Sequence, residues 1–137
     1  MAFQAGKSSV FKLDNSGGAL VDLSAYVTNV SLPRDVDMLD VTTLGKSAKN
    51  YIPGLGNATL SIQGKWDPTV DAQLASLLTA PNGSTTFEYG PQGATVGNIR
   101  YTGECFLTKY EPPTNVSGAV EFSAEFQVTD VVTRNTY

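Results

Sequence analysis

The sequence predicts an all-β domain, either a β-sandwich or a small barrel, with one packed α-helix. Its 137 residues are typical of one domain, so residues 1–137 are expected to share a single core. The content of 41% hydrophobic and 16% charged residues, together with 13 glycines, favours strands and turns over a helical bundle. Residues 57–66 and 118–133 alternate apolar and polar side chains, which is the pattern of strands that are buried on one face.

The first part of the chain is predicted to consist of short strands and turns. Asn15-Ser16-Gly17-Gly18 is a tight-turn sequence between two apolar runs, and Pro33 ends a third run. The predicted strands are residues 10–13, 19–23, 26–32 and 36–43. Residues 1–9 are small and polar, and we expect a flexible N-terminal arm there. Residues 45–56 are predicted to form a long assembly loop, because a loop with exposed apolar side chains indicates a partner.

The second part combines the alternating strands with the helix. The apolar face of residues 57–66 is Leu60, Ile62, Gly64 and Trp66, which places Trp66 in the core. Asp67 is suited to cap a helix and Pro68 to its first turn, and apolar residues recur at Val70, Leu74, Leu77 and Leu78. Further strands are predicted at residues 85–89, 98–110 and 118–133. Cys105 lies in one of these alternating strands, so we predict a buried, inert thiol.

The residue types argue against an enzyme. The chain has no histidine, which excludes Ser-His-Asp and Cys-His nucleophile pairs and histidine zinc sites. Gly45-Lys46-Ser47 is not a phosphate loop, because Asp40 stands where that motif needs its first glycine. Asp35, Asp37 and Asp40 lack the glycine and the terminal glutamate of a calcium loop. We therefore predict no catalytic residue, no cofactor and no metal.

The net charge and the absence of targeting signals limit which ligands and which cellular location we expect. A formal charge of -4 and a pI near 4.6 argue against specific nucleic-acid binding. The sequence has no secretory signal and no apolar run near the roughly 18 residues of a membrane helix, so we expect a protein made in the cytoplasm with no membrane partner. One alternative is a secreted carbohydrate-binding or adhesion module, in which Tyr51, Trp66, Tyr101 and Tyr110 would form a sugar-stacking platform.

Residues 36–68 carry a resemblance to a known family. An aspartate-threonine strand at residues 40–43 is followed by a loop with an aromatic residue and a glycine at 51–54. A small-residue alternating strand at 57–66 and then Asp67, before the helix, complete the pattern. The pattern resembles the tail tube proteins of bacteriophages with long non-contractile tails, and the order of elements matches over nearly the whole chain. Related secretion tubes share that fold, so a tube subunit of a phage-derived secretion apparatus is a second alternative.

The resemblance implies a non-enzymatic structural subunit of a virion tail, made in the host bacterial cytoplasm. Such subunits form hexameric rings that stack into a tube around a channel for viral DNA. The implied partners are therefore copies of this chain and other tail proteins, such as tape measure, terminator and tip proteins. Sheets placed side by side would close an inter-subunit β-barrel and cover their own edges.

Two groups of residues are expected to carry this assembly. A channel that conducts a polyanion needs polar, mildly acidic walls, because such walls repel phosphates and do not bind the DNA. The polar strand faces are therefore expected to line the lumen. These lumen residues are Thr59, Ser61, Gln63, Glu104, Thr108, Glu121, Ser123, Glu125 and Gln127. The expected inter-subunit contacts are Phe3, Lys46, Lys49, Tyr51, Ile52 and Leu55.

Overall fold

The computed structural model describes residues 3, 5–15, 17–79, 83–112, 116 and 118–137. The elements in chain order are η1 (Gly6–Ser8), β1 (Val10–Asp14), β2 (Leu20–Asp22), β3 (Val27–Ser31), β4 (Arg34–Asp40), β5 (Tyr51–Lys65), α1 (Pro68–Thr79), β6 (Thr85–Gly90), β7 (Ile99–Glu111) and β8 (Glu121–Thr136). The predicted strands and helix are confirmed. Some boundaries are wrong. Residues 51–56 belong to β5 and not to the loop predicted at 45–56, and residues 41–43, predicted as strand, follow the end of β4.

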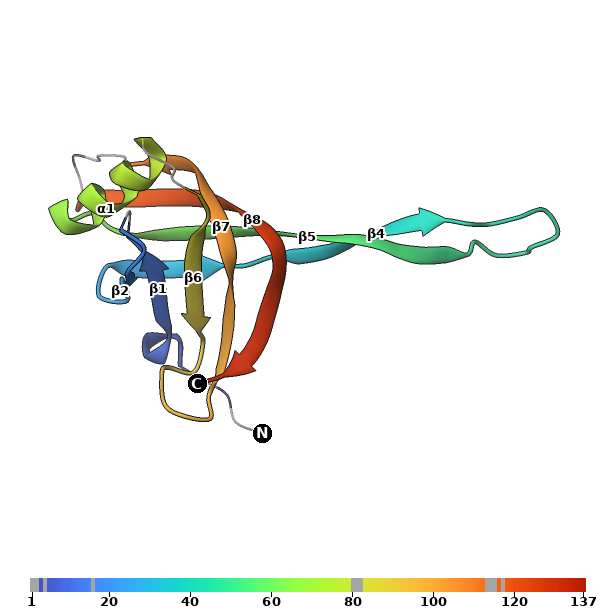
Figure 1. Ribbon diagram of the computed structural model, residues 1–137, viewed down its shortest axis with the longest axis horizontal. Helices are drawn as coiled ribbons and strands as arrows, with labels where there is room; N and C mark the ends of the chain where they lie inside the picture. Colours follow the sequence, from blue (N-terminus) through green and yellow to red (C-terminus); the bar gives the residue numbers. More distant parts are fainter. Residues whose placement is uncertain (1–2, 4, 16, 80–82, 113–115, 117) are drawn as a thin grey trace.

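The strands form one antiparallel sheet that curls into a half-barrel (Figure 1). Within the described part of the chain, the sheet has eight strands in the order β2-β1-β6-β7-β8-β5-β3, and β4 pairs with β5 beyond the end of β3. The all-β class with one helix is therefore confirmed. Of the two predicted arrangements, the curled sheet is nearer to a barrel than to a sandwich of two sheets.

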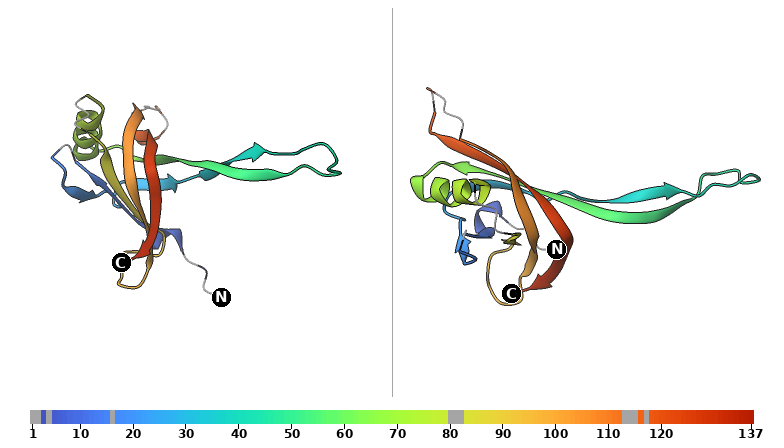
Figure 2. Two further views of the ribbon diagram at one scale, coloured as in Figure 1. Left: turned by 45° about the vertical axis from the view of Figure 1, so that its right-hand side comes forward. Right: turned by 45° about the horizontal axis from the view of Figure 1, so that its top comes forward.

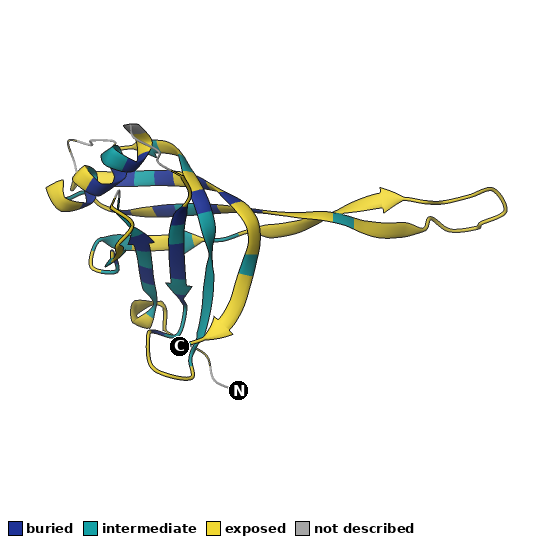
Figure 3. Ribbon diagram, viewed as in Figure 1, coloured by how far each residue is buried: buried dark blue, intermediate teal, exposed yellow. Residues whose placement is uncertain are grey.

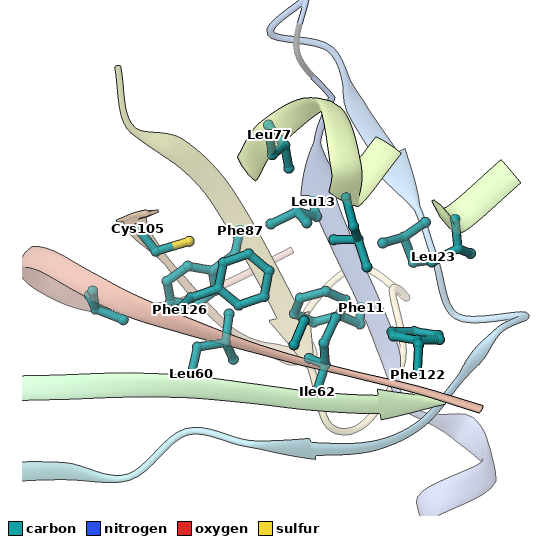
Figure 4. Close-up of a cluster of buried hydrophobic side chains, with 14 of the residues drawn as sticks. Phe11, Leu13, Leu23, Leu60, Ile62, Leu77, Phe87, Cys105, Phe122 and Phe126 are labelled. Carbon is teal, nitrogen blue, oxygen red and sulfur yellow. The ribbon is translucent and has the colours of Figure 1, made fainter. Parts of the chain in front are cut away.

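The core fills the concave side of the curled sheet (Figures 3 and 4). Four phenylalanines from three strands are fully buried: Phe11 on β1, Phe87 on β6, and Phe122 and Phe126 on β8. Burial of each such side chain contributes about 2–3 kcal/mol. Helix α1 packs against this cluster through Val70, Leu74 and Leu77, which are buried as their helical spacing predicts. Cys105 is also buried there, as predicted.

The sequence around α1 explains where the helix begins. The Asp67 carboxylate accepts a hydrogen bond from the Thr69 backbone N–H (2.9 Å), and Pro68 occupies the first helical position. Trp66 packs against the core, as predicted, and its Nε1 donates to Asp71 Oδ1 (3.3 Å). The hydroxyl of Tyr110 on β7 donates to the same oxygen (2.7 Å). Asp71 thus links the helix to β7 and to the residue that follows β5. Among the described residues, no helix has the length and apolar content to cross a membrane.

Strand β8 bends sharply at a bulge, and there it separates from β5 (Figure 2). Gly103 of β7 alone stands opposite residues 130–132 of β8. Asp130 adopts a left-handed φ of 65°, and its Oδ1 accepts a hydrogen bond from the Val131 N–H (2.9 Å). Gly103 leaves room for the core, since a Cβ there would lie 3.0 Å from Phe87 Cε1. Beyond this bend, β8 stays with β7 while β5 continues outward with β4.

Candidate assembly surfaces

The convex side of β5 and β8 carries polar side chains in register. Six predicted lumen residues form three directly opposite pairs, which are Thr59 with Gln127, Ser61 with Glu125, and Gln63 with Ser123. The fourth pair is Glu121 with Lys65, whose Nζ lies 2.6 Å from Glu121 Oε1. We call this surface, together with its continuation on β7, the polar face.

Strand β7 extends the polar face, but a bulge changes which residues lie on it. The register shifts between Leu107 and Lys109, so the alternation of β7 moves by one residue. Lys109 and Glu111 consequently stand opposite polar-face residues of β8, where they were not predicted. Thr108 lies in the bulge and is exposed, and its hydroxyl donates to the carbonyl of Glu125 (3.0 Å). No residue type in this stretch is typical of a bulge, so the apolar-polar alternation of the sequence could not predict it.

The remaining residue predicted for the lumen, Glu104, lies further along the same face. It is half-buried, and its Oε1 accepts a hydrogen bond from the Thr86 hydroxyl of β6 (2.8 Å). Phe106 stands opposite Gln127 with 41% of its surface exposed, which adds an apolar side chain to the polar face. The charged residues of the polar face are Glu104, Glu111, Glu121, Glu125, Lys65 and Lys109. With four carboxylates against two ammonium groups, the face is negative but partly neutralised.

A long two-stranded hairpin leaves the body and buries almost none of its own surface (Figures 1 and 3). We define the hairpin as β4, residues 41–50 and residues 51–58 of β5. Met38 stands opposite Pro53, and the next pair, Leu39 and Ile52, points to the other face because side chains alternate along a strand. Met38 and Leu39 are 61% and 50% exposed. Apolar side chains are therefore exposed on both faces of the hairpin.

The end of the hairpin, residues 41–50, is held by local hydrogen bonds. The Thr42 hydroxyl accepts from the Asn50 N–H (2.8 Å), and the Val41 N–H donates to the Asn50 carbonyl (2.9 Å). A hydrogen bond from the Thr42 side chain, and a second one from its backbone N–H, lower the pKa of Asp40. Gly45 has a φ of 88° in the turn that follows. We call residues 41–50 the hairpin tip, and it carries Leu44, Lys46 and Lys49, all exposed.

The six residues expected at inter-subunit contacts fall in two separate places. Tyr51, Ile52 and Leu55 lie on the hairpin half of β5 and are 50%, 48% and 83% exposed. Lys46 and Lys49 lie close by in the hairpin tip. Phe3 is 88% exposed near the N-terminus, and the N-terminus lies at the lower end of the body, away from the hairpin tip (Figure 1). The hairpin therefore unites five of the six residues, and Phe3 stands apart.

Comparison with known proteins gives matches among solved structures. No protein-family model and no curated protein matches the chain. A chain in the tail of an empty gene transfer agent (GTA) particle, computed with C6 symmetry, is 15% identical, with 98% of this chain and 100% of that chain covered at a TM-score of 0.80. The SPP1 tail tube is 15% identical, with 98% and 80% covered at a TM-score of 0.77. A sheath-tube complex of an extracellular contractile injection system is 9% identical, with 98% and 93% covered at 0.75. This chain has the tail-tube fold.

The tail-tube fold confirms the resemblance found in residues 36–68. Residues 40–43 and 51–54, which carry two parts of that pattern, lie near the outer end of the hairpin, where Asp40 stands opposite Tyr51. Residues 57–66 follow as the part of β5 that enters the body, and Asp67 caps α1. The pattern thus describes the hairpin and its attachment to the body of the tail-tube fold.

The described residues offer nothing that points to a metal or thiol centre. They contain no group of three or more His, Cys, Asp or Glu side chains placed to hold a metal ion. Burial raises the pKa of the Cys105 thiol to about 12, and the nearby charges of Glu104 and Asp14 act in the same direction. At neutral pH the Cys105 side chain is a protonated, apolar part of the core.

Proposed function

We propose that this protein is a structural subunit of a bacteriophage tail tube, acting in the virion tail by assembly with copies of itself. The observation that carries the proposal is the match to a phage-like tail chain over 98% of this chain and 100% of that one at a TM-score of 0.80. The exposed hairpin is the second support, because a monomer gains nothing from apolar side chains on two open faces.

Lateral closure into hexameric rings fits the unpaired edges of the sheet. Strands β2 and β3 are the ends of the strand order, and each presents unpaired backbone groups to a neighbour. Six sheets placed side by side would pair or cover these edges and form an inter-subunit β-barrel. The C6 symmetry used for the similar tail supports six copies. In this arrangement the polar face lines the lumen, and the predicted lumen residues become its wall.

The lumen would conduct viral DNA without binding it. Four carboxylates and two lysines leave the polar face net negative, so it repels phosphates on balance while the lysines moderate the field. Rings would then stack through the hairpin and the segment with Phe3, which supply a contact that repeats without closing. Other tail proteins, such as tape measure, terminator and tip proteins, would meet the two ends of the stack.

A second candidate is the inner tube of an injection apparatus that carries no genome. The match to a contractile injection system tube complex at a TM-score of 0.75 favours it. The two candidates share the assembled state and differ in cargo. Purified tube-bearing particles that contain DNA would support the phage tail, whereas particles free of DNA would support the injection apparatus.

Negative-stain microscopy of a hairpin-shortened variant tests the proposal. Val36 and Gly56 stand directly opposite each other, so residues 37–55 can be replaced by an Asn-Gly turn that keeps the register. We expect the native protein to form tubes and the shortened variant to remain as folded monomers or single rings. As a control, Val96→Ser alters an exposed apolar residue outside the hairpin and should leave tubes intact. Absence of tubes from the native protein at any concentration would contradict the proposed function. If the shortened variant formed tubes of normal length, the hairpin would not be part of the axial contact.

A further inference from the structure

A groove opens where the hairpin diverges from β8. Residues 59–65 of β5 pair with residues 121–127 of β8, and after that the two strands separate. Residues 128–136 of β8 then pair with β7 alone, and the hairpin half of β5 pairs with β4 alone. The space between them has a volume of about 640 Å³. We call it the fork groove, and its lining includes Asp35, Val36, Leu55, Val128, Asp130 and Val131.

The fork groove combines apolar surface with two carboxylates. Val131 is 74% exposed because the bulge at Asp130 turns it out of the β8 alternation. No ion pair involves Asp35 or Asp130 within the part of the chain that the structure describes. Arg34, the one cation among the described residues of the lining, lies over the ring of Tyr101 at 5.2 Å from its centroid. The groove therefore favours a ligand that offers an apolar side chain beside positive charge.

The hairpin tip offers that combination. Leu44 is fully exposed, at 103% of its reference area, and the turn that follows presents Lys46 and Lys49 within five residues of it. In the described residues neither lysine has an ion-pair partner. The residues that line the groove lie where the hairpin joins the body. The hairpin tip lies at the other end of the hairpin (Figure 1), so the two cannot meet within one chain. Their complementary chemistry is available only between copies.

We propose that the hairpin tip of one copy docks in the fork groove of a second copy, with Leu44 against Val131 and with Lys46 and Lys49 facing Asp35 and Asp130. This inference rests on the proposed function, and it names the two surfaces of the axial contact. The contact joins different surfaces of the two copies, so it is heterologous and leaves a free tip and a free groove at the ends of the stack. Growth along the axis follows from that repetition.

Disulfide trapping in assembled tubes tests the contact directly. Native Cys105 is buried and protonated at neutral pH, so it does not interfere. Tubes of the double variant Leu44→Cys/Val131→Cys are assembled under reducing conditions, checked by microscopy and then oxidised. We expect a ladder of covalent oligomers on a non-reducing denaturing gel, and no ladder from either single variant. The matched control is Leu44→Cys/Val96→Cys, which places the second thiol at a residue that is 87% exposed but outside the groove.

A charge exchange provides a second, independent readout. Lys46→Glu/Lys49→Glu should raise the protein concentration needed for tubes roughly tenfold, and adding Asp35→Lys/Asp130→Asn should reverse most of that rise. Asparagine is chosen at position 130 because it tolerates the left-handed backbone there. Three outcomes would each overturn the docking site and leave the proposed function standing. They are tubes of the Leu44→Cys/Val131→Cys variant that give no ladder, a ladder from the Val96→Cys control, and no recovery of tube formation in the charge-exchanged variant. Failure of the native protein to form tubes would overturn both.

Discussion

Single residues of this protein set how closely its strands approach. Gly64 lies where the turn before β3 crosses β5, and the Lys65 N–H donates to the Tyr26 carbonyl there (2.8 Å). A Cβ on Gly64 would lie 2.2 Å from that carbonyl oxygen and 2.9 Å from Phe122 Cε1. In the sequence, Gly64 simply occupies an inward position of an alternating strand, so its role as a crossing point is visible only in three dimensions.

We predict that Gly64→Ala destabilises the protein by about 3 kcal/mol, because backbone and a buried ring would both have to move. Urea unfolding of the free subunit measures this change. Gly118→Ala is the control, since a Cβ there meets nothing within 4 Å, and we expect it to change stability by less than about 0.5 kcal/mol. Equal unfolding midpoints for the two variants would show that the crossing can relax at no cost.

A second residue-level prediction concerns Tyr110. Burial raises its pKa from 10.0 to about 12, and the hydrogen bond to Asp71 adds to the shift. Because the folded pKa lies above the unfolded value, this contribution to stability is complete below pH 10 and is lost as pH rises to about 12. Tyr110→Phe should lower stability by about 1 kcal/mol at pH 7 and make the loss between pH 10 and 12 shallower. Melting temperatures across that range provide the measurement, and parallel curves for the two proteins would contradict it.

At the scale of elements, the sequence predicts the features that depend on local residue patterns. It does not predict the features that depend on which strands pair with each other. The strands, α1 with its Asp67 cap, and the polar alternation on β5 and β8 all follow from periodicity and capping chemistry. Residues 51–56 looked like a loop because they carry glycine, proline and no alternation, yet pairing with β4 makes them a strand. The two bulges on β7 and β8 have no sequence signature, so Lys109 and Glu111 were missed on the polar face.

The hairpin should be the least protected element of the free subunit. A two-stranded ribbon without a core is marginal in water, and almost all of the hairpin's residues are exposed. We predict fast amide exchange for residues 35–56 and 5–9 in the monomer, and strong protection of both in tubes. Residues 121–128 serve as the internal control, because the core holds them in both states. Strong protection of the hairpin in the monomer would mean that it needs no partner.

For the whole molecule, the fold places a polar sheet face and a hairpin with exposed apolar side chains on one chain. The polar face is built from in-register pairs whose ion pair, Lys65 with Glu121, is more than half exposed on both sides. Such pairs contribute little to stability, typically less than about 1 kcal/mol. Their side chains can therefore be substituted without disturbing the core behind them.

That separation leads to a prediction for the lumen. Glu121→Lys/Glu125→Lys should leave folding and tube formation intact, because both side chains are exposed, but should slow genome passage by giving phosphates a positive wall. Glu121→Gln/Glu125→Gln is the matched control, which removes charge without reversing it and should have a smaller effect. The measurement is DNA release from particles carrying each tube. If the lysine variant released DNA at the native rate, the polar face would not line the lumen.

The continuity of β5 from the hairpin into the body has a mechanical consequence. A pull on the tip travels along β5 into the body sheet, where β5 is next to the edge strand β3 and is flanked by β8 and β3. The hydrogen bonds of those two ladders lie across the direction of pull, so they resist it together and not one after another. The hairpin itself is a thin ribbon with no second layer behind it and resists sideways deflection weakly. A stack of rings joined by such ribbons would be hard to stretch and easy to bend.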